Sequence, residues 1–281
     1  MKRAIQVTDQ AGYCFGVRRA LDMVKDYLSE KTKKVYSLGP IIHNPEVVEE
    51  LRKKGLATVN TLDDVEEGVV VIRSHGVEKK LLDEIHRKGL EIVDATCPFV
   101  RNAQRLAQKL SEDGYQVVIV GEQAHPEVKG IVGYCMKEPI VVSNAEQLKN
   151  KEIGPKVGVL AQTTQAQENF AKVVEALLTV AYECRIYNTI CKATQSRQTA
   201  AVEMANAVDV MFVVGGKNSA NTARLAELCR TSGATTYHIE SADEIVPEMV
   251  RGKERIGITA GASTPRSHVD AVRAALEQLG S

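Results

Sequence analysis

The sequence lacks tryptophan and has few other aromatic residues, with 8 Tyr and 4 Phe among 281 residues. Single-stranded nucleic acids bind on aromatic platforms, so such platforms are scarce here. An excess of charge of one sign is also absent, because 36 Lys and Arg balance 36 Asp and Glu. Nucleic-acid-binding domains typically carry a clear basic excess. We therefore expect no nucleic-acid partner.

Long hydrophobic runs are absent as well. The longest unbroken run of aliphatic or aromatic residues has five members, at 210–214, whereas a membrane-spanning helix needs about 20. The opening MKRAIQVTDQ has neither the apolar segment of a signal peptide nor the Ser/Arg-rich character of a transit peptide. These absences favour a cytoplasmic protein that has no membrane partner.

Common nucleotide-binding and disulfide patterns are missing too. The chain contains neither a Walker A motif nor G-x-G-x-x-G, so ATP and dinucleotide sites are not supported. Its 6 cysteines include no C-x-x-C pair and are spaced too widely for a small disulfide-linked scaffold. We therefore expect reduced thiols, and the question becomes whether any of them are ligands.

Three cysteines mark an internal repeat. Cys14, Cys97 and Cys191 each stand just before a segment with the i, i+3, i+4, i+7 apolar spacing of an amphipathic helix. Two short β-branched runs follow each helix, as expected for buried parallel strands. The first of these runs begins 21, 20 and 19 residues after its cysteine. The six predicted strands begin at Val35, Val69, Val117, Val157, Val210 and Ile256.

This alternation predicts an α/β fold made of three similar parallel-sheet units. We place the units at residues 14–96, 97–190 and 191–281. Residues 1–13 are expected to lend a strand to the last unit. No Gly/Ser/Pro-rich linker separates the units, which predicts tight packing.

Small polar segments follow all six predicted strands, at the edge where open α/β sheets bind ligands. Three of them contain a histidine, namely His43, His75 and His125. The others supply Thr163, Thr164, Ser219, Asn221 and Ser263. Hydroxyl, amide and imidazole groups, with main-chain amides at helix N-termini, bind phosphate without net positive charge. The set predicts an anion site, although Gly, Ser and Asn are also ordinary turn residues.

The three repeated cysteines meet at the centre if the units surround a pseudo-threefold axis. A helix N-terminus favours the thiolate form of each. Three thiolates without a fourth protein ligand suit a [4Fe–4S] cluster with one open iron, or a zinc ion with one open site. The wide spacing favours the cluster. We expect Cys135, Cys184 and Cys229, which have no repeat partners, to be structural.

Glu127 lies two residues after His125 in one of these strand-end segments. A carboxyl group beside an open iron could deliver a proton to a leaving oxygen. A solvated loop glutamate is the alternative at this position.

Nine motifs occur in order across almost the whole chain: GYCFGV at Cys14, HN at His43, SHGV at His75, DATCP at Cys97, AHPEV at His125, QTT at Thr163, CKATQSRQ at Cys191, GGKNSAN at Ser219 and TAGAS at Ser263. Together they closely resemble the 4-hydroxy-3-methylbut-2-enyl diphosphate reductase family. Ala220 departs from the pattern, because many relatives carry a second Ser there.

The resemblance implies a pseudo-threefold arrangement of the three units around a central iron–sulfur cluster. This would be one [4Fe–4S] cluster per chain with three ligands, Cys14, Cys97 and Cys191. It implies a reductive removal of the substrate's allylic hydroxyl by two electrons, giving isopentenyl and dimethylallyl diphosphate. An electron donor such as ferredoxin or flavodoxin would be required. Glu127, Thr163 and His125 would be catalytic, with Glu127 relaying protons. The substrate would be bound by His43, His75, His125, Thr163, Thr164, Ser219, Asn221 and Ser263.

Two alternatives belong to other classes. A redox-neutral enzyme with a three-cysteine open cluster, similar to quinolinate synthase, would consume no reducing equivalents. A non-enzymatic sensor of phosphorylated metabolites would contain no stoichiometric iron and sulfide.

Overall fold

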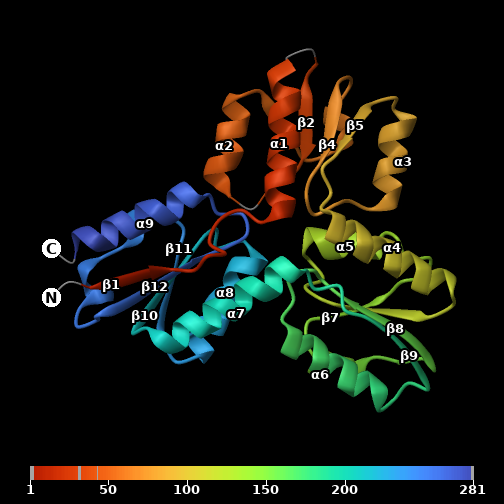
Figure 1. Ribbon diagram of the computed structural model, residues 1–281. Helices are drawn as coiled ribbons and strands as arrows, with labels where there is room; N and C mark the ends of the chain where they lie inside the picture. Colours follow the sequence, from red (N-terminus) through yellow and green to blue (C-terminus); the bar gives the residue numbers. More distant parts are fainter. Residues whose placement is uncertain (1–2, 31–32, 43, 280–281) are drawn as a thin grey trace. The chain divides into compact units, whose positions relative to one another are not determined.

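The computed structural model describes residues 3–30, 33–42 and 44–279. Its strands form three parallel four-stranded sheets, with helices between successive strands (Figure 1). The predicted α/β class with three similar parallel-sheet units is therefore confirmed. All six predicted strands are present, and in every sheet they form the central pair.

The first sheet has the order β3-β2-β4-β5, with β2 at Val35–Leu38, β3 at Leu56–Val59, β4 at Val69–Ile72 and β5 at Glu91–Asp94. Its helices are α1 (Phe15–Glu30), α2 (Pro45–Lys53) and α3 (Lys79–Arg87). The second sheet has the order β7-β6-β8-β9, with β6 at Gln116–Val120, β7 at Ile140–Val142, β8 at Lys156–Ala161 and β9 at Glu183–Tyr187. Its helices are α4 (Pro98–Glu112), α5 (Pro126–Val132) and α6 (Gln167–Leu178).

The third sheet combines both ends of the chain. Its order is β11-β10-β12-β1, with β1 at Ala4–Val7, β10 at Val210–Val214, β11 at Thr235–Ile239 and β12 at Arg255–Ala260. Strand β1 pairs in parallel with β12, so that Ile5 lies opposite Ile256; in Figure 1 the red strand runs beside the blue one. The N-terminal segment thus lends a strand to this sheet, as predicted. The helices are α7 (Lys192–Ala207), α8 (Ala220–Thr231) and α9 (Arg266–Gln278).

Both faces of the third sheet are covered by helices. Val269 and Leu276 of α9 pack against Phe212 on one face. Ala201 of α7 and Leu225 of α8 belong to the cluster on the other face (Figure 1). Burial of both faces explains why the central strands are continuous apolar runs.

By compactness the chain divides into two units, residues 1–17, 43–47 and 192–281, and residues 18–42 and 48–191. The former contains the third sheet and the latter the first two. The borders that we placed at residues 14, 97 and 191 stay a prediction. Within the described ranges, no helix combines the length and the apolar character needed to cross a bilayer.

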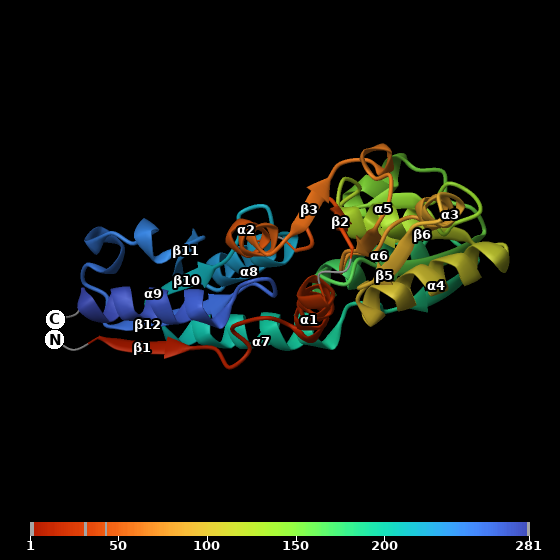
Figure 2. The same cartoon turned by 90° about the horizontal axis from the view of Figure 1, so that it is seen from above.

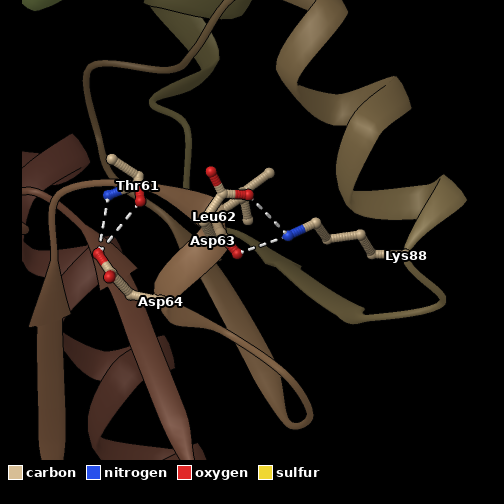
Figure 3. A network of polar contacts seen from close by, with 5 residues as sticks. All are labelled: Thr61, Leu62, Asp63, Asp64 and Lys88. Atoms are coloured by element: carbon tan, nitrogen blue, oxygen red, sulfur yellow. Dashed lines mark hydrogen bonds and ion pairs between the residues drawn. The ribbon is translucent and has the colours of Figure 1, made fainter.

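A small polar network connects the segment after β3 with the end of α3 (Figure 3). Lys88, which follows α3, donates to the carbonyl of Leu62 at 2.8 Å and contacts the carboxylate of Asp63 at 3.3 Å. The main-chain amide and the hydroxyl of Thr61 contact the carboxylate of Asp64 at 3.4 and 3.2 Å. Because the Asp63 side chain is 90% exposed, its ion pair adds little stability. The bond from Lys88 to the carbonyl of the buried Leu62 contributes more than this ion pair to holding the two segments together.

Candidate functional site

The same main-chain contact holds the three repeated cysteines. In each sheet the cysteine amide donates to a carbonyl two residues beyond the end of the third strand: Cys97 to Ser74 at 3.0 Å, Cys191 to Thr163 at 3.0 Å and Cys14 to Ala262 at 3.1 Å. Each cysteine also stands directly before a helix, namely α4, α7 or α1. The sequence repeat therefore corresponds to a repeated local geometry at the carboxyl edge of each sheet.

No disulfide joins these three cysteines, so their thiols can serve as metal ligands. The Cys14 sulfur accepts a bond from the Val17 amide at 3.5 Å, as expected at a helix N-terminus. Cys97 and Cys191 belong to one compact unit and Cys14 to the other. A centre formed by all three stays a prediction. Within each unit taken alone, the described residues include no group of three His, Cys, Asp or Glu side chains placed to hold a metal ion.

The remaining cysteines have a different character. Burial raises the pKa of Cys135 to about 11 and that of Cys229 to about 11, and it also raises the pKa of Cys184. Such thiols stay protonated near neutral pH and are poor nucleophiles. This agrees with the structural role that we expected from their lack of repeat partners.

A buried carboxyl group lies at the carboxyl edge of the second sheet. Glu127, in the first turn of α5, is 2% exposed. Thr163 holds both of its oxygens, through the main-chain amide at 2.6 Å and the hydroxyl at 2.9 Å. Burial raises the pKa of Glu127 to about 7, although the two bonds from Thr163 oppose this shift. The group can therefore hold or release a proton near neutral pH.

Two of the predicted histidines lie together near the start of α5. His125 is the N-cap of α5, and its Nδ1 accepts a bond from the Glu127 amide at 3.1 Å. Because Nδ1 accepts, a neutral His125 carries its proton on Nε2 and can donate there. The His75 ring meets the His125 ring edge to face, with centroids 5.6 Å apart. Of the other predicted residues, Thr164 accepts a bond at its hydroxyl from the Gln162 side chain at 3.0 Å. The predicted His43 lies outside the described residues.

Two predicted residues, Ser219 and Asn221, lie at the N-terminus of α8, and Ser263 lies in the segment after β12. Ser219 is the N-cap, and its hydroxyl accepts from the Thr222 amide at 3.4 Å. Ser219, Asn221 and Ser263 are 3%, 6% and 9% exposed. Among the described residues, the Asn221 Nδ2 atom is buried without a hydrogen-bond partner. Such a group costs about 1–3 kcal/mol, and a bound anion would satisfy it.

Glycines allow the backbone to pack closely at this edge. A Cβ atom on Gly261 would lie 2.0 Å from Oγ1 of Thr222, and one on Gly215 would lie 2.5 Å from Oγ1 of Thr264. Both contacts are far shorter than real Cβ atoms make. The glycines therefore fix how closely the N-terminus of α8 approaches the carboxyl end of β12.

Arg197 was not singled out from the sequence, although it lies in the CKATQSRQ motif that follows Cys191. The structure buries it, with 4% exposure. The sequence offered one signal for this residue, namely an arginine in the helix that follows a candidate ligand. This signal is weak, because most arginines on helices are exposed and have no such role.

Comparisons with known proteins agree with this geometry. The LytB protein family model matches residues 5–277. A 4-hydroxy-3-methylbut-2-enyl diphosphate reductase of Trichlorobacter lovleyi is 49% identical over 97% of this chain and 97% of its own length. The solved structure of an (E)-4-hydroxy-3-methyl-but-2-enyl diphosphate reductase, described as the terminal enzyme of the non-mevalonate pathway, is 42% identical, with a TM-score of 0.71 over 98% of this chain and 99% of that one.

A solved diphosphate reductase from Plasmodium falciparum shares the fold. Its TM-score is 0.91 at 24% identity, over 96% of this chain and 86% of that one. The resemblance that the nine motifs indicated is confirmed, and the chain belongs to the LytB protein family.

Proposed function

We propose that this protein reduces (E)-4-hydroxy-3-methylbut-2-enyl diphosphate to isopentenyl diphosphate and dimethylallyl diphosphate. The reaction consumes two electrons and two protons, breaks the allylic C–O bond and releases the oxygen as water. The buried Glu127, with a pKa of about 7 and both oxygens held by Thr163, carries the proposal. The relatives described above bear the name of this activity.

Cys14, Cys97 and Cys191 would hold one [4Fe–4S] cluster per chain. Support comes from the donor set, because three thiols share one backbone environment and leave one iron without a protein ligand. When bound, the cluster supplies single electrons and a Lewis-acidic iron. A pseudo-threefold arrangement of the three sheets would bring the ligands together.

Glu127 would supply the proton that the leaving oxygen needs. A carboxyl group with a pKa near neutrality keeps a substantial protonated fraction at physiological pH. Thr163 fixes the direction of the carboxyl group, because its amide and hydroxyl bind one oxygen each. The neutral His125, held through Nδ1, would present its Nε2 proton to the substrate.

The diphosphate would be bound by imidazole, hydroxyl and amide groups: His43, His75, His125, Ser219, Asn221 and Ser263. The unpartnered Nδ2 of Asn221 supports this role, as does the position of Ser219 at the N-terminus of α8. Thr164 would bind the substrate beside Thr163. We further propose a cytoplasmic location and an electron donor of the ferredoxin or flavodoxin class.

The test is an anaerobic assay on protein whose iron and sulfide content has been measured after cluster reconstitution. Oxidation of a reduced viologen dye is followed when the substrate is added. We expect oxidation in the wild type and in Cys184→Ser, and none in Cys14→Ser. A wild-type sample that holds iron and sulfide but oxidises no dye would contradict the reductase and favour a redox-neutral enzyme. A sample that takes up no iron would favour a metabolite sensor.

A further inference from the structure

We infer that Arg197 positions the cluster ligand Cys14 by clamping the loop in front of it to the end of β12. The inference rests on the proposed iron–sulfur function. Figure 2 shows the loop after the N-terminal strand β1 passing beside α7, the helix that carries Arg197. Residues far apart in the sequence thus lie side by side here.

The guanidinium of Arg197 donates to three main-chain carbonyls. Its NH1 group binds the carbonyl of Gln10 and, at 2.8 Å, that of Ala260. Its NH2 group binds the carbonyl of Gly12 at 3.0 Å. Arg197 is 4% exposed. Bonds from a charged donor are stronger than neutral ones, and removal of a buried partner of this kind is costly.

The three carbonyls define what the clamp controls. Gln10 and Gly12 belong to the loop between β1 and α1, and Ala260 is the last residue of β12. Two residues after Ala260 lies Ala262, whose carbonyl accepts the Cys14 amide at 3.1 Å. Arg197 therefore holds both sides of the contact that fixes the backbone of Cys14.

The other two ligands do not need such a clamp. Cys97 follows β5 by three residues and Cys191 follows β9 by four, whereas Cys14 follows β1 by seven. A side chain at the end of the strand closes each short connection: Asp94 accepts the Thr96 amide at 2.9 Å, and Asn188 accepts the Ile190 amide at 3.2 Å. A local turn of this kind cannot span the longer loop before Cys14. Arg197 of α7 holds that loop instead.

The chemistry of the clamp requires arginine. A guanidinium is planar, stays charged and offers five donors in fixed directions, so that it can serve carbonyls from separate segments. A lysine has one ammonium group at the end of its stem and reaches fewer of them. Partners that orient a metal ligand typically change metal affinity about 10- to 100-fold when removed.

The experiment compares Arg197→Met and Arg197→Lys with wild type and with Arg266→Met as the matched control. Arg266 contacts the same loop, through the Ala11 carbonyl at 3.4 Å, but its side chain is 54% exposed. Each protein is reconstituted anaerobically. We measure iron and sulfide per chain, the rate of iron loss to a chelator, the EPR spectrum of the reduced cluster and the melting temperature of the cluster-free protein.

We expect Arg197→Met to lose iron about 10-fold faster than wild type or more, with an altered EPR spectrum. The rate of iron loss from Arg197→Lys should lie between those of Arg197→Met and wild type. Arg266→Met should lose iron at the wild-type rate. If Arg197→Met does not fold, Arg197→Lys decides alone. Wild-type iron loss and EPR spectra in the Arg197 variants, even with a lower melting temperature, would overturn the inference. A wild type that binds no cluster would instead overturn the proposed function.

Discussion

Thr163 binds both carboxyl oxygens of Glu127, through its amide at 2.6 Å and its hydroxyl at 2.9 Å. The carbonyl of the same threonine accepts the amide of Cys191. One residue therefore orients the proposed proton donor and supports the backbone of a proposed cluster ligand. This shared support holds the proposed proton donor and one proposed cluster ligand at the same edge of the second sheet.

Replacing Glu127 by glutamine should abolish most turnover while leaving the cluster in place. The amide keeps the size of the carboxyl group but has no proton to deliver, and general acids contribute about 10²–10⁴-fold to rate. We expect kcat to fall by about 100-fold or more on that scale, with unchanged iron content. Glu122→Gln, which changes an exposed carboxylate nearby, is the control. A kcat near wild type in Glu127→Gln would remove this residue from the mechanism.

The rate should also depend on pH through Glu127. Its pKa is about 7, and a proton donor must be protonated to act. We therefore expect kcat to fall as the pH rises through about 7, measured with saturating substrate and a reductant whose potential does not limit the rate. The residual kcat of Glu127→Gln should not show this fall with pH. If kcat falls in the same way in both proteins, another group is responsible for the pH dependence.

The raised pKa of Glu127 has a consequence for stability. The native state keeps this proton up to about pH 7, whereas the ordinary pKa of a free Glu is 4.5. Between these values the folded protein binds more protons than the unfolded chain, so stability is lost as the pH rises. One pKa unit corresponds to about 1.4 kcal/mol, so the shift amounts to roughly 3 kcal/mol.

This loss can be measured on cluster-free protein at pH 5 and pH 8. The melting temperature of wild type should drop more between these values than that of Glu127→Gln, which has no proton to lose at this position. The other titrating groups are common to both proteins and cancel in the comparison. Equal drops would show that Glu127 is not held with a raised pKa.

Asn221→Ala should weaken substrate binding without weakening the fold. Its Nδ2 atom is buried and has no hydrogen-bond partner among the described residues, so removing it costs the free protein little. We expect KM to rise by about 10-fold, as for the loss of a bond to a charged group. Asn169→Ala is the reciprocal control, because Asn169 donates to the Ser143 carbonyl at 2.7 Å. That variant should lose stability and keep its KM.

Gly261→Ala should disturb the N-terminus of α8. The new methyl group would lie 2.0 Å from Oγ1 of Thr222, which forces the helix and the strand end apart. We expect a loss of about 1–3 kcal/mol in stability and a higher KM for the diphosphate. Gly154→Ala is the control, because its nearest neighbour would be the Gln116 side chain at 3.4 Å. Unchanged melting temperature and KM in Gly261→Ala would contradict the close packing.

Local patterns in the sequence determined the central strands and the helices that follow Cys14, Cys97 and Cys191. Strands such as β4 and β10 are buried on both faces and have continuous apolar sequences. The edge strands β3 and β5 are partly exposed. Their mixed composition does not stand out from the neighbouring loops, and they were not predicted.

The sequence by itself also determined which chemical groups lie at the strand ends, because position in an α/β repeat fixes the edge at which a residue emerges. Only the tertiary structure decided what those groups can do. Glu127 and Thr163 are separated by 36 positions, and their pairing depends on the register of two strands. The pKa of Glu127 depends on side chains that exclude water from all sides. Arg197 likewise became a clamp only because the two ends of the chain share one sheet, a long-range contact that no local pattern encodes.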